Sequence, residues 1–168
     1  MTGDYSPVRK LLPADIVDTF DCGQEELNLF LQRYAWVNQK AQNVQTYVSC
    51  LEKEVVGYYS LAVGSVVHAA APNRVTRGLA RHPVPVMILA RLAVDHGQQG
   101  RGLGRALLKD ALLRTVQAAD IAGIRDLLVH AKDEMAQQWY ASWDFEPSPT
   151  DPYHLFLLLK DLKAIVNK

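Results

Sequence analysis

Apolar side chains recur along the chain in two rhythms, one typical of helices and the other of strands. Four residues at helical spacing, Leu27, Phe30, Leu31 and Tyr34, indicate an amphipathic helix in the first quarter of the chain. We expect that helix to span residues 23–39. Asp21 is its expected N-cap, because Asp side chains accept hydrogen bonds from first-turn amides.

Runs of apolar and β-branched residues bounded by turn signals predict the strands. The expected strands are residues 8–12, 44–51, 55–67, 84–94, 126–131 and 154–160. Two further helices are expected over residues 102–122 and 133–143, and a loop or short irregular helix over 70–83. Hairpin and crossover connections alternate in this order, which predicts a mixed α/β sheet of about six strands flanked by helices.

Composition agrees with one folded domain over residues 1–168. Hydrophobic residues make up 49% and charged residues 21%, which excludes a disordered or collagen-like chain. No apolar run is long enough to span a bilayer, and the N-terminus lacks the apolar core of a signal peptide. Cys22 and Cys50 fit no metal-binding spacing. They could form a single disulfide, but two thiols in a reducing compartment are the expectation. We therefore expect a cytoplasmic protein with no membrane contact and no metal site.

Charge is balanced overall and unevenly distributed. Eighteen Lys and Arg residues match eighteen Asp and Glu residues, which by itself argues against a general polyanion binder. Residues 73–114, however, hold eight bases and two acids, and the remaining residues hold ten bases and sixteen acids. Such asymmetry is typical of a local polyanion site or of scattered surface arginines.

The sharpest local feature is the segment V-D-H-G-Q-Q-G-R-G-L-G at residues 94–104, between a predicted strand and a predicted helix. Glycines let backbone amides approach an anion, and a helix N-terminus adds positive potential, so a phosphate or pyrophosphate is expected here. A Walker A loop is excluded because no Lys-Ser/Thr follows. A dinucleotide-binding loop starting at Gly100 is weakened because Arg105 stands where its third glycine belongs. A glycine-rich turn that binds nothing stays open as an alternative.

Gln99, Gly102 and Gly104 match the pattern Gln/Arg-x-x-Gly-x-Gly/Ala, which resembles the acyl-CoA loop of the GNAT superfamily of N-acetyltransferases. The resemblance implies a GNAT-like acyl-CoA N-acyltransferase fold with acetyl-CoA as co-substrate. It also implies that loop amides hold the CoA pyrophosphate and that the preceding strand, bulged near its end, pairs with the pantetheine arm. The implied acetyl-CoA contacts are Leu92, Val94, Gln99, Gly100, Arg101, Gly102, Leu103, Gly104 and Arg105.

A second segment, A-Q-Q-W-Y-A-S-W-D-F at residues 136–145, resembles the GNAT pattern A-x-x-F-Y-x-x-x-G-F. The resemblance implies that Tyr140 lies near the thioester sulfur and serves as the catalytic acid; a core aromatic is the alternative. Asp144 replaces the family glycine, and Asp tolerates a left-handed backbone better than most residues. Asp133 stands where many members have a CoA-contacting Asn, so helix capping is its simpler role.

Two further segments narrow the resemblance. F-D-C-G at residues 20–23 followed by L-N-x-F-L, and A-R-L-A-V-D at residues 90–95 running into the glycine loop, resemble bacterial GNAT toxins of type II toxin–antitoxin pairs. This implies acetylation of the α-amino group of aminoacyl-tRNA, which blocks translation. It further implies a homodimer neutralised by a ribbon–helix–helix antitoxin, with operator DNA contacted only through that antitoxin.

No residue stands out as a general base, since the five histidines are scattered. An α-amine with a pKa of about 7.7–8.0 is partly neutral at pH 7, which mildly favours an aminoacyl ester over a lysine side chain. A backbone amide near Val94 is the expected oxyanion donor. Arg91, inside an apolar strand, is expected to meet the tRNA acceptor end or an internal carboxylate. The other expected tRNA contacts are Arg74, Arg77 and Arg81.

Two other functions remain compatible with the sequence. A GNAT enzyme of the same fold could acetylate a small-molecule amine or a protein N-terminus. A non-catalytic CoA-binding module acting through a partner is a further alternative, against which the intact Tyr140, Gly102 and Gly104 count.

Overall fold

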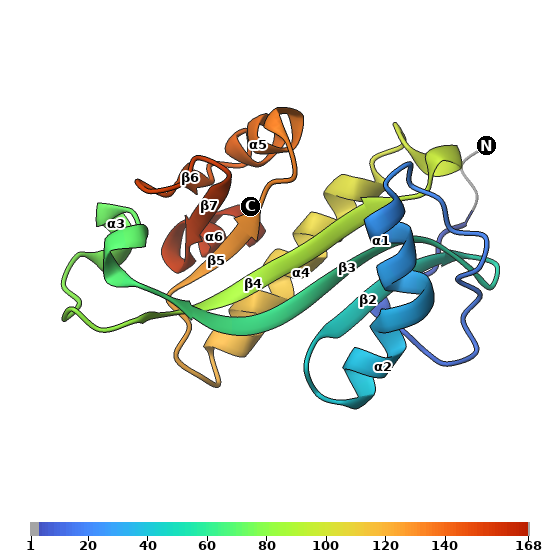
Figure 1. The fold of residues 1–168 in the computed structure, drawn as a ribbon, viewed down its shortest axis with the longest axis horizontal. Coiled ribbons are helices and arrows are strands. Elements are labelled where there is room, and N and C mark those ends of the chain that lie inside the picture. The colour runs from blue at the N-terminus through green and yellow to red at the C-terminus, as the bar shows by residue number, and fades with distance from the viewer. Residues whose placement is uncertain (1–3, 168) are drawn as a thin grey trace. The chain divides into compact units, whose positions relative to one another are not determined.

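A computed structural model describes residues 4–167 and contains one seven-stranded sheet in the order β1-β2-β3-β4-β5-β7-β6 (Figure 1). The strands are β1 (Arg9–Lys10), β2 (Gln45–Leu51), β3 (Glu54–Val66), β4 (Val84–Val94), β5 (Asp126–His130), β6 (Glu146–Pro147) and β7 (His154–Leu158). β4 pairs with β5 in parallel, whereas β2 with β3 and β5 with β7 pair antiparallel. The predicted mixed α/β sheet is therefore confirmed.

The helices connect these strands. They are α1 (Glu25–Leu29), α2 (Ala35–Lys40), α3 (Asn73–Thr76), α4 (Leu103–Ala119), α5 (Glu134–Ala141) and α6 (Leu159–Val166). A π turn, η1 (Phe30–Tyr34), joins α1 to α2, and 3-10 turns η2 (His68–Ala70) and η3 (His96–Gln98) precede α3 and α4. The expected irregular segment over residues 70–83 thus contains the short helix α3.

The chain divides into two compact units. The first comprises the residues up to Ala62 together with Ala90–Ala111, and the second comprises Val63–Leu89 together with the residues from Leu112 onward. Strands β3 and β4 and helix α4 contribute residues to both. One domain over residues 1–168 stays a prediction.

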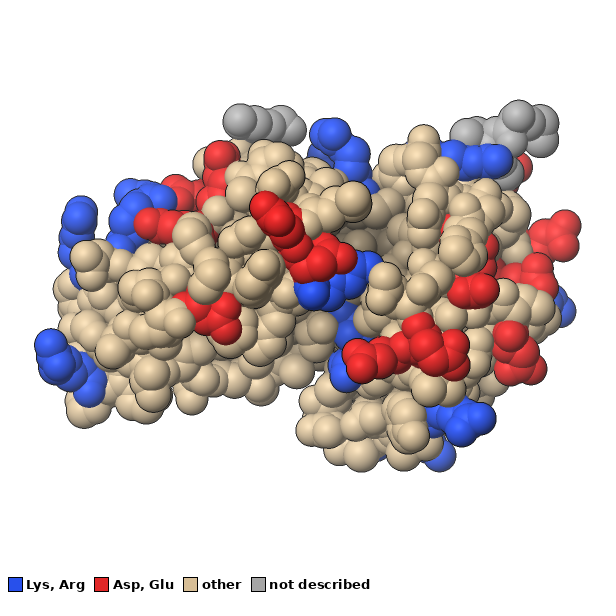
Figure 2. Space-filling view, turned by 45° about the horizontal axis from the view of Figure 1, so that its top comes forward, with Lys and Arg blue, Asp and Glu red and all other residues tan. Residues whose placement is uncertain are grey.

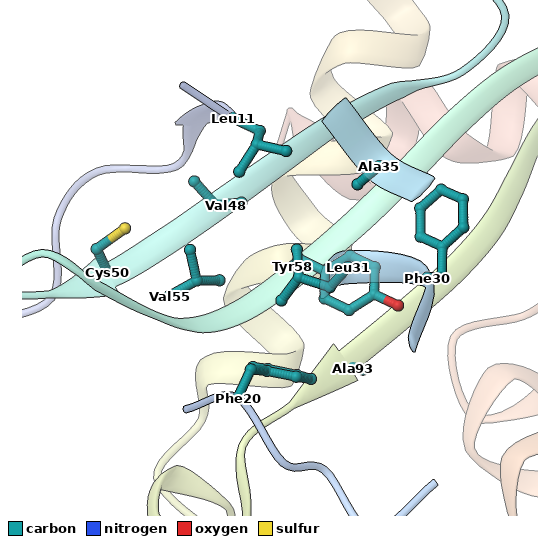
Figure 3. Close-up of a cluster of buried hydrophobic side chains, with 10 residues drawn as sticks. All are labelled: Leu11, Phe20, Phe30, Leu31, Ala35, Val48, Cys50, Val55, Tyr58 and Ala93. Carbon is teal, nitrogen blue, oxygen red and sulfur yellow. The ribbon is translucent and has the colours of Figure 1, made fainter. Parts of the chain in front are cut away.

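In the first unit the helical segment packs on one face of β2, β3 and the end of β4 (Figure 3). Phe30, Leu31 and Ala35 of this segment are buried in one cluster with Val48 and Tyr58 of the strands. The Tyr58 ring stacks on Phe30, with ring centroids 6.2 Å apart, and its hydroxyl donates to the Leu27 carbonyl at 2.7 Å. Burial of these large side chains stabilises the unit by about 1.5–3 kcal/mol per side chain.

The predicted helix over residues 23–39 forms with two differences. The π turn adds a residue to one helical turn, which leaves Tyr34 exposed and brings Ala35 into the buried face. Asp21 is not the N-cap, which was a wrong prediction: Gln24 takes that position without a side-chain hydrogen bond. Gly23, at φ +88°, turns the chain between Asp21 and the helix, so the helical amides begin beyond the reach of this carboxylate.

The second unit has its own core, formed by Val84 and Val86 of β4 with Leu128 of β5 and Phe156 of β7. β6 is the strand that the sequence did not indicate, because it is two residues long and contains Pro147, which confines it to a sheet edge. The last strand is predicted to reach residue 160 but ends at Leu158, and α6 begins at Leu159. No helix in the described part of the chain is long and apolar enough to cross a bilayer.

Candidate functional site

The glycine loop follows β4 in the first unit and leads into α4. Gly100 and Gly102 have φ angles of +78° and +85°, the left-handed region that side chains other than glycine adopt at a cost of about 1–2 kcal/mol. A Cβ atom at either position would have no atom within 4 Å. These glycines are therefore required by backbone conformation, and the backbone here is open to a ligand.

The start of the loop is tied to the N-terminal segment. The Asp95 carboxylate accepts hydrogen bonds from the Gly97 amide at 2.9 Å and the Asp21 amide at 3.0 Å. The His96 amide in turn donates to the Asp21 carbonyl at 2.9 Å. Hydrogen bonds from Gly23 and Asn28 lower the pKa of the Asp21 carboxyl. Residues 20–23 thus brace the glycine loop, a role that local helix-capping rules could not indicate.

Gly23 fits this arrangement closely. An added Cβ at Gly23 would lie 3.0 Å from Cε1 of His96, so the imidazole packs against the bare backbone. The His96 Nε2 lies 3.6 Å from the Asp21 carboxylate, an ion pair when the imidazole is protonated. His96 is therefore placed as a loop anchor rather than as a base.

The helical end of the loop is held by packing. Leu103, the first residue of α4, is buried against Gly57 of β3, where an added Cβ would come within 3.0 Å of its Cδ2. Because the Leu103 side chain is buried, only the backbone of Leu103 could contact a bound anion. Gly104 faces Val94, whose Cγ2 would lie 3.9 Å from an added Cβ. Arg101 is exposed and has no ion-pair partner among residues 4–167, and Arg105 is exposed one turn further along.

The end of β4 presents the strand edge expected to meet pantetheine. The register of β4 with β5 ends at the pair Leu89 and Val129, and β4 continues to Val94. Gln99 donates from Nε2 to the Val94 carbonyl at 2.9 Å and so ties the loop back to the strand. Leu92 and Val94 are half-buried. Their acetyl-CoA contacts, the bulge and the oxyanion role of an amide near Val94 stay predictions.

Arg91, on the same stretch of β4, lies over an aromatic ring. Its guanidinium carbon is 3.7 Å from the centroid of Phe30, and no carboxylate pairs with it within the described chain. A cation over a ring contributes about 0.5–2 kcal/mol and leaves the guanidinium N–H groups available. The internal salt bridge considered from the sequence is absent from residues 4–167, and the contact with tRNA stays a prediction.

Tyr140 belongs to the second unit, on α5. Asp133 caps this helix by accepting from the Ala136 amide at 2.8 Å, which confirms its predicted capping role. The Tyr140 ring makes edge contacts with Trp139 and Phe145, at centroid distances of 5.0 Å and 5.4 Å. Asp144 follows the helix at φ +72°, as its replacement of a glycine predicted.

Within the described part of the chain, the hydroxyl of Tyr140 lacks the hydrogen-bond partner that a buried phenol usually has. It has no hydrogen-bond partner within residues 4–167, and burial raises the pKa of Tyr140 well above its usual range. Buried phenol groups usually find a partner. This hydroxyl therefore keeps its proton at neutral pH and is free to donate it.

The three loop arginines differ in their surroundings. Arg74, Arg77 and Arg81 are all exposed, and Arg74 forms an ion pair with Asp161 at 2.8 Å.

On the face shown in Figure 2, Lys and Arg side chains lie among Asp and Glu side chains rather than in one continuous basic patch. Any polyanion contact on this face is therefore local.

His, Cys, Asp and Glu side chains form no group of three or more that could hold a metal ion in the described part of the chain. The His130 and His154 rings stack with centroids 4.1 Å apart, and burial together with the neighbouring His154 lowers the pKa of His130. Cys22 and Cys50 are not joined in a disulfide.

Known proteins resemble this chain along nearly all of its length. An acetyltransferase (GNAT) domain model matches residues 42–147. A tRNA-acetylating toxin of Mycobacterium tuberculosis is 49% identical over 163 residues, which are 97% of this chain and 98% of that protein. The structure of AtaT complexed with acetyl-methionyl-tRNAfMet matches with a TM-score of 0.89 at 28% identity, covering 96% of this chain and 99% of that one.

A second similar structure is a tyrosine-to-phenylalanine mutant of the AtaT toxin bound to the C-terminus of the antitoxin AtaR and acetyl-CoA. It matches with a TM-score of 0.84 at 29% identity and covers 98% of this chain and 99% of that one. The domain model spans more than half of the chain, and the mycobacterial relative spans nearly all of it. The chain belongs to the GNAT acetyltransferase family, whose members use acetyl-CoA as the acetyl donor.

Proposed function

We propose that this protein is a toxin that transfers the acetyl group of acetyl-CoA to the α-amino group of aminoacyl-tRNA and thereby blocks translation. The observation that carries the proposal is the 49% identity, over nearly the full length of both chains, with a tRNA-acetylating toxin. The match to AtaT complexed with acetyl-methionyl-tRNAfMet supports the same substrate class. Fold alone would not name a substrate.

The residues of the glycine loop fit an acyl-CoA pyrophosphate. The left-handed glycines expose backbone amides, α4 begins directly after them, and Arg101 adds an unpaired charge within the described chain. The hydrogen bonds of Asp95 and Gln99 fix this conformation before any ligand binds, which reduces the ordering cost of binding. Acetyl-CoA supplies a thioester carbonyl that an amine can attack.

In the proposed reaction the neutral amine attacks the thioester carbonyl, the C–N bond forms and the C–S bond breaks. A backbone amide near Val94 donates to the developing oxyanion. Tyr140 gives its proton to the departing thiolate, and the proton lost by the acetylated nitrogen restores the phenol through solvent. The unpartnered, protonated hydroxyl of Tyr140 suits this role.

No general base is assigned. An aminoacyl α-amine has a lower pKa than a lysine side chain, so a useful fraction is neutral at pH 7. His96 is engaged as a loop anchor, and His130 stacks on His154. The absence of an assigned base therefore fits an aminoacyl ester better than a protein lysine.

We further propose a ribbon–helix–helix antitoxin as the neutralising partner, with operator DNA contacted through it, and a homodimer as the active form. The similar AtaT structure bound to the C-terminus of AtaR, and a structure of the AtaT–AtaR complex bound to DNA, support an antitoxin partner. The ribbon–helix–helix type and the homodimer rest on the resemblance of the N-terminal segment.

The test of the proposed function is incubation of the protein with labelled acetyl-CoA and a set of charged tRNAs. We expect N-acetyl-aminoacyl-tRNA as product from at least one charged tRNA and none from uncharged tRNA. Turnover of a small amine or a peptide N-terminus, without turnover of any charged tRNA, would support the other acetyltransferase function instead. Acetyl-CoA binding without turnover of any amine would support the binding module.

Replacing Arg91 by Ala tests the tRNA contact on β4. Arg91→Ala should raise the KM for charged tRNA about ten- to a hundredfold, because a charge-assisted contact contributes about 1.5–3 kcal/mol, and should leave the Kd for acetyl-CoA unchanged. Steady-state kinetics and calorimetry give the two values. An equal loss of both would assign Arg91 a structural role on Phe30.

A further inference from the structure

The second unit contains a pocket of about 340 Å³ with a strongly basic lining. Its cationic residues are Arg74, Arg77, Arg125, Lys160 and Lys163. Ile124, Leu158 and Leu159 complete the lining with apolar surface. We refer to this as the basic pocket.

Three elements bring these residues together. Arg125 directly precedes β5, and its carbonyl accepts a hydrogen bond from the Leu159 amide at the start of α6, at 3.2 Å. The Arg125 guanidinium donates from Nε to the Val75 carbonyl at 2.8 Å and from Nη2 to the Arg77 carbonyl at 3.3 Å. The side chain of Arg125 thereby contacts the region of α3, and its main chain, directly before β5, contacts the start of α6.

The positive charge of the basic pocket is largely uncompensated. Asp161 pairs with Arg74, at 2.8 Å. Arg77, Lys160 and Lys163 have no carboxylate partner within residues 4–167. Lys160 and Lys163 are exposed and lie three residues apart on α6, which places them on one helical face. Like charges at this spacing repel one another, so an anion in the pocket is stabilised by all of them together.

The chemistry of the lining favours a polynucleotide phosphate. Arginine forks and lysine ammonium groups are the side chains that contact backbone phosphates, and the lining has no aromatic ring on which a free nucleotide base could stack. The pocket exceeds the roughly 30 Å³ share of one liquid water about tenfold, so it has room for a phosphate with part of its ribose. The apolar side chains offer contact to that ribose.

We propose that the basic pocket binds backbone phosphates of the tRNA substrate. This inference rests on the proposed function and adds Arg125, Lys160 and Lys163 to the tRNA contacts indicated by the sequence. These residues lie outside the basic segment 73–114 and reach the same surface only through the fold. Phosphate contacts of this kind position the substrate and are not selective for its sequence.

The test uses the double variant Lys160→Gln/Lys163→Gln in the full chain, with uncharged tRNA as the binding probe. We expect tRNA affinity near physiological salt to fall about tenfold and the slope of log K against log salt to decrease by about 1.5, because two phosphate contacts are lost. The KM for charged tRNA should rise by a similar factor, with kcat and the Kd for acetyl-CoA unchanged.

The matched control is Lys10→Gln/Lys53→Gln, which removes the same charge from exposed positions in the first unit. Its tRNA affinity should stay within twofold of wild type, and the thermal midpoints of both variants should match the wild type. Equal weakening by both double variants would overturn the inference, because the effect would then be one of net charge. Unchanged tRNA affinity with weakened binding of inorganic phosphate, or of an antitoxin, would also overturn it.

Failure of the basic-pocket proposal can be distinguished from failure of the proposed function. If the wild-type protein acetylates charged tRNA and Lys160→Gln/Lys163→Gln binds tRNA as well as wild type, the basic pocket alone is wrong. If the wild-type protein acetylates no charged tRNA, the proposed function fails whatever the variants bind.

Discussion

Replacing Tyr140 by Phe should reduce acetyl transfer about 10²–10⁴-fold while leaving acetyl-CoA affinity and thermal stability close to wild type. The rate loss is that expected when a positioned general acid is removed. Stability should change little because the Tyr140 hydroxyl has no hydrogen-bond partner within residues 4–167, so its removal leaves no buried group unpaired. Single-turnover kinetics, acetyl-CoA calorimetry and thermal unfolding give the three readouts.

Tyr153→Phe is the matched control, because Tyr153 lies in the same unit and is exposed. It should transfer acetyl groups at the wild-type rate. A fully active Tyr140→Phe would remove Tyr140 as the acid. A variant that loses activity and thermal stability together would instead identify Tyr140 as a packing residue held between Trp139 and Phe145.

The sheet and the loop could be predicted from the sequence because their signals are local. Runs of apolar and β-branched residues indicated β2, β3, β4, β5 and β7, and the glycines indicated the turn before α4. Asp133 and Asp144 were assigned correctly for the same reason, since a helix cap and a left-handed residue depend on the few residues around them.

The predictions from the sequence are wrong where residues distant along the chain determine the local structure. The sequence predicts Asp21 as a helix cap, whereas in the structure its backbone is hydrogen-bonded to Asp95 and His96, more than seventy residues away. The π turn precedes Ala35, which is buried against the strands, and no regular helical period predicts such a turn.

The basic pocket shows the same limit for charge. Counting along the chain located the basic segment 73–114 but not Arg125, Lys160 or Lys163. The antiparallel pairing of β5 with β7, in which Asp126 faces Leu158, brings Arg125 beside the start of α6. A count of charges along the chain therefore underestimates a basic surface that α3, β5, β7 and α6 assemble in the fold.

Asp126 gives the second large effect, on stability rather than on catalysis. It opens β5, is fully buried, and both carboxylate oxygens lack a hydrogen-bond partner among the described residues. Burial raises its pKa to about 7, against the opposing influence of Arg125. Its ordinary value is 3.8. The folded protein is therefore most stable when this buried carboxyl group is protonated.

The free energy of unfolding changes with pH because the Asp126 carboxyl group loses its proton at different pH values in the folded and the unfolded chain. Below about pH 4 the group is protonated in both the folded and the unfolded chain, and its contribution to stability is fully present. Between about pH 4 and pH 7 the unfolded chain loses the proton first, so the free energy of unfolding falls. The total fall is up to about 4 kcal/mol, since each unit of pKa difference corresponds to about 1.4 kcal/mol.

Asp126→Asn should remove this pH dependence, because the amide has the same shape and carries no charge. We expect the variant to be about 2–4 kcal/mol more stable than wild type at pH 8 and within about 1 kcal/mol of it at pH 4, by denaturant unfolding at both values. Asp120→Asn, at an exposed position, is the control and should follow the wild-type curve. Parallel pH curves for Asp126→Asn and wild type would contradict the prediction, because they would mean that water or a cation compensates the carboxylate in the folded protein.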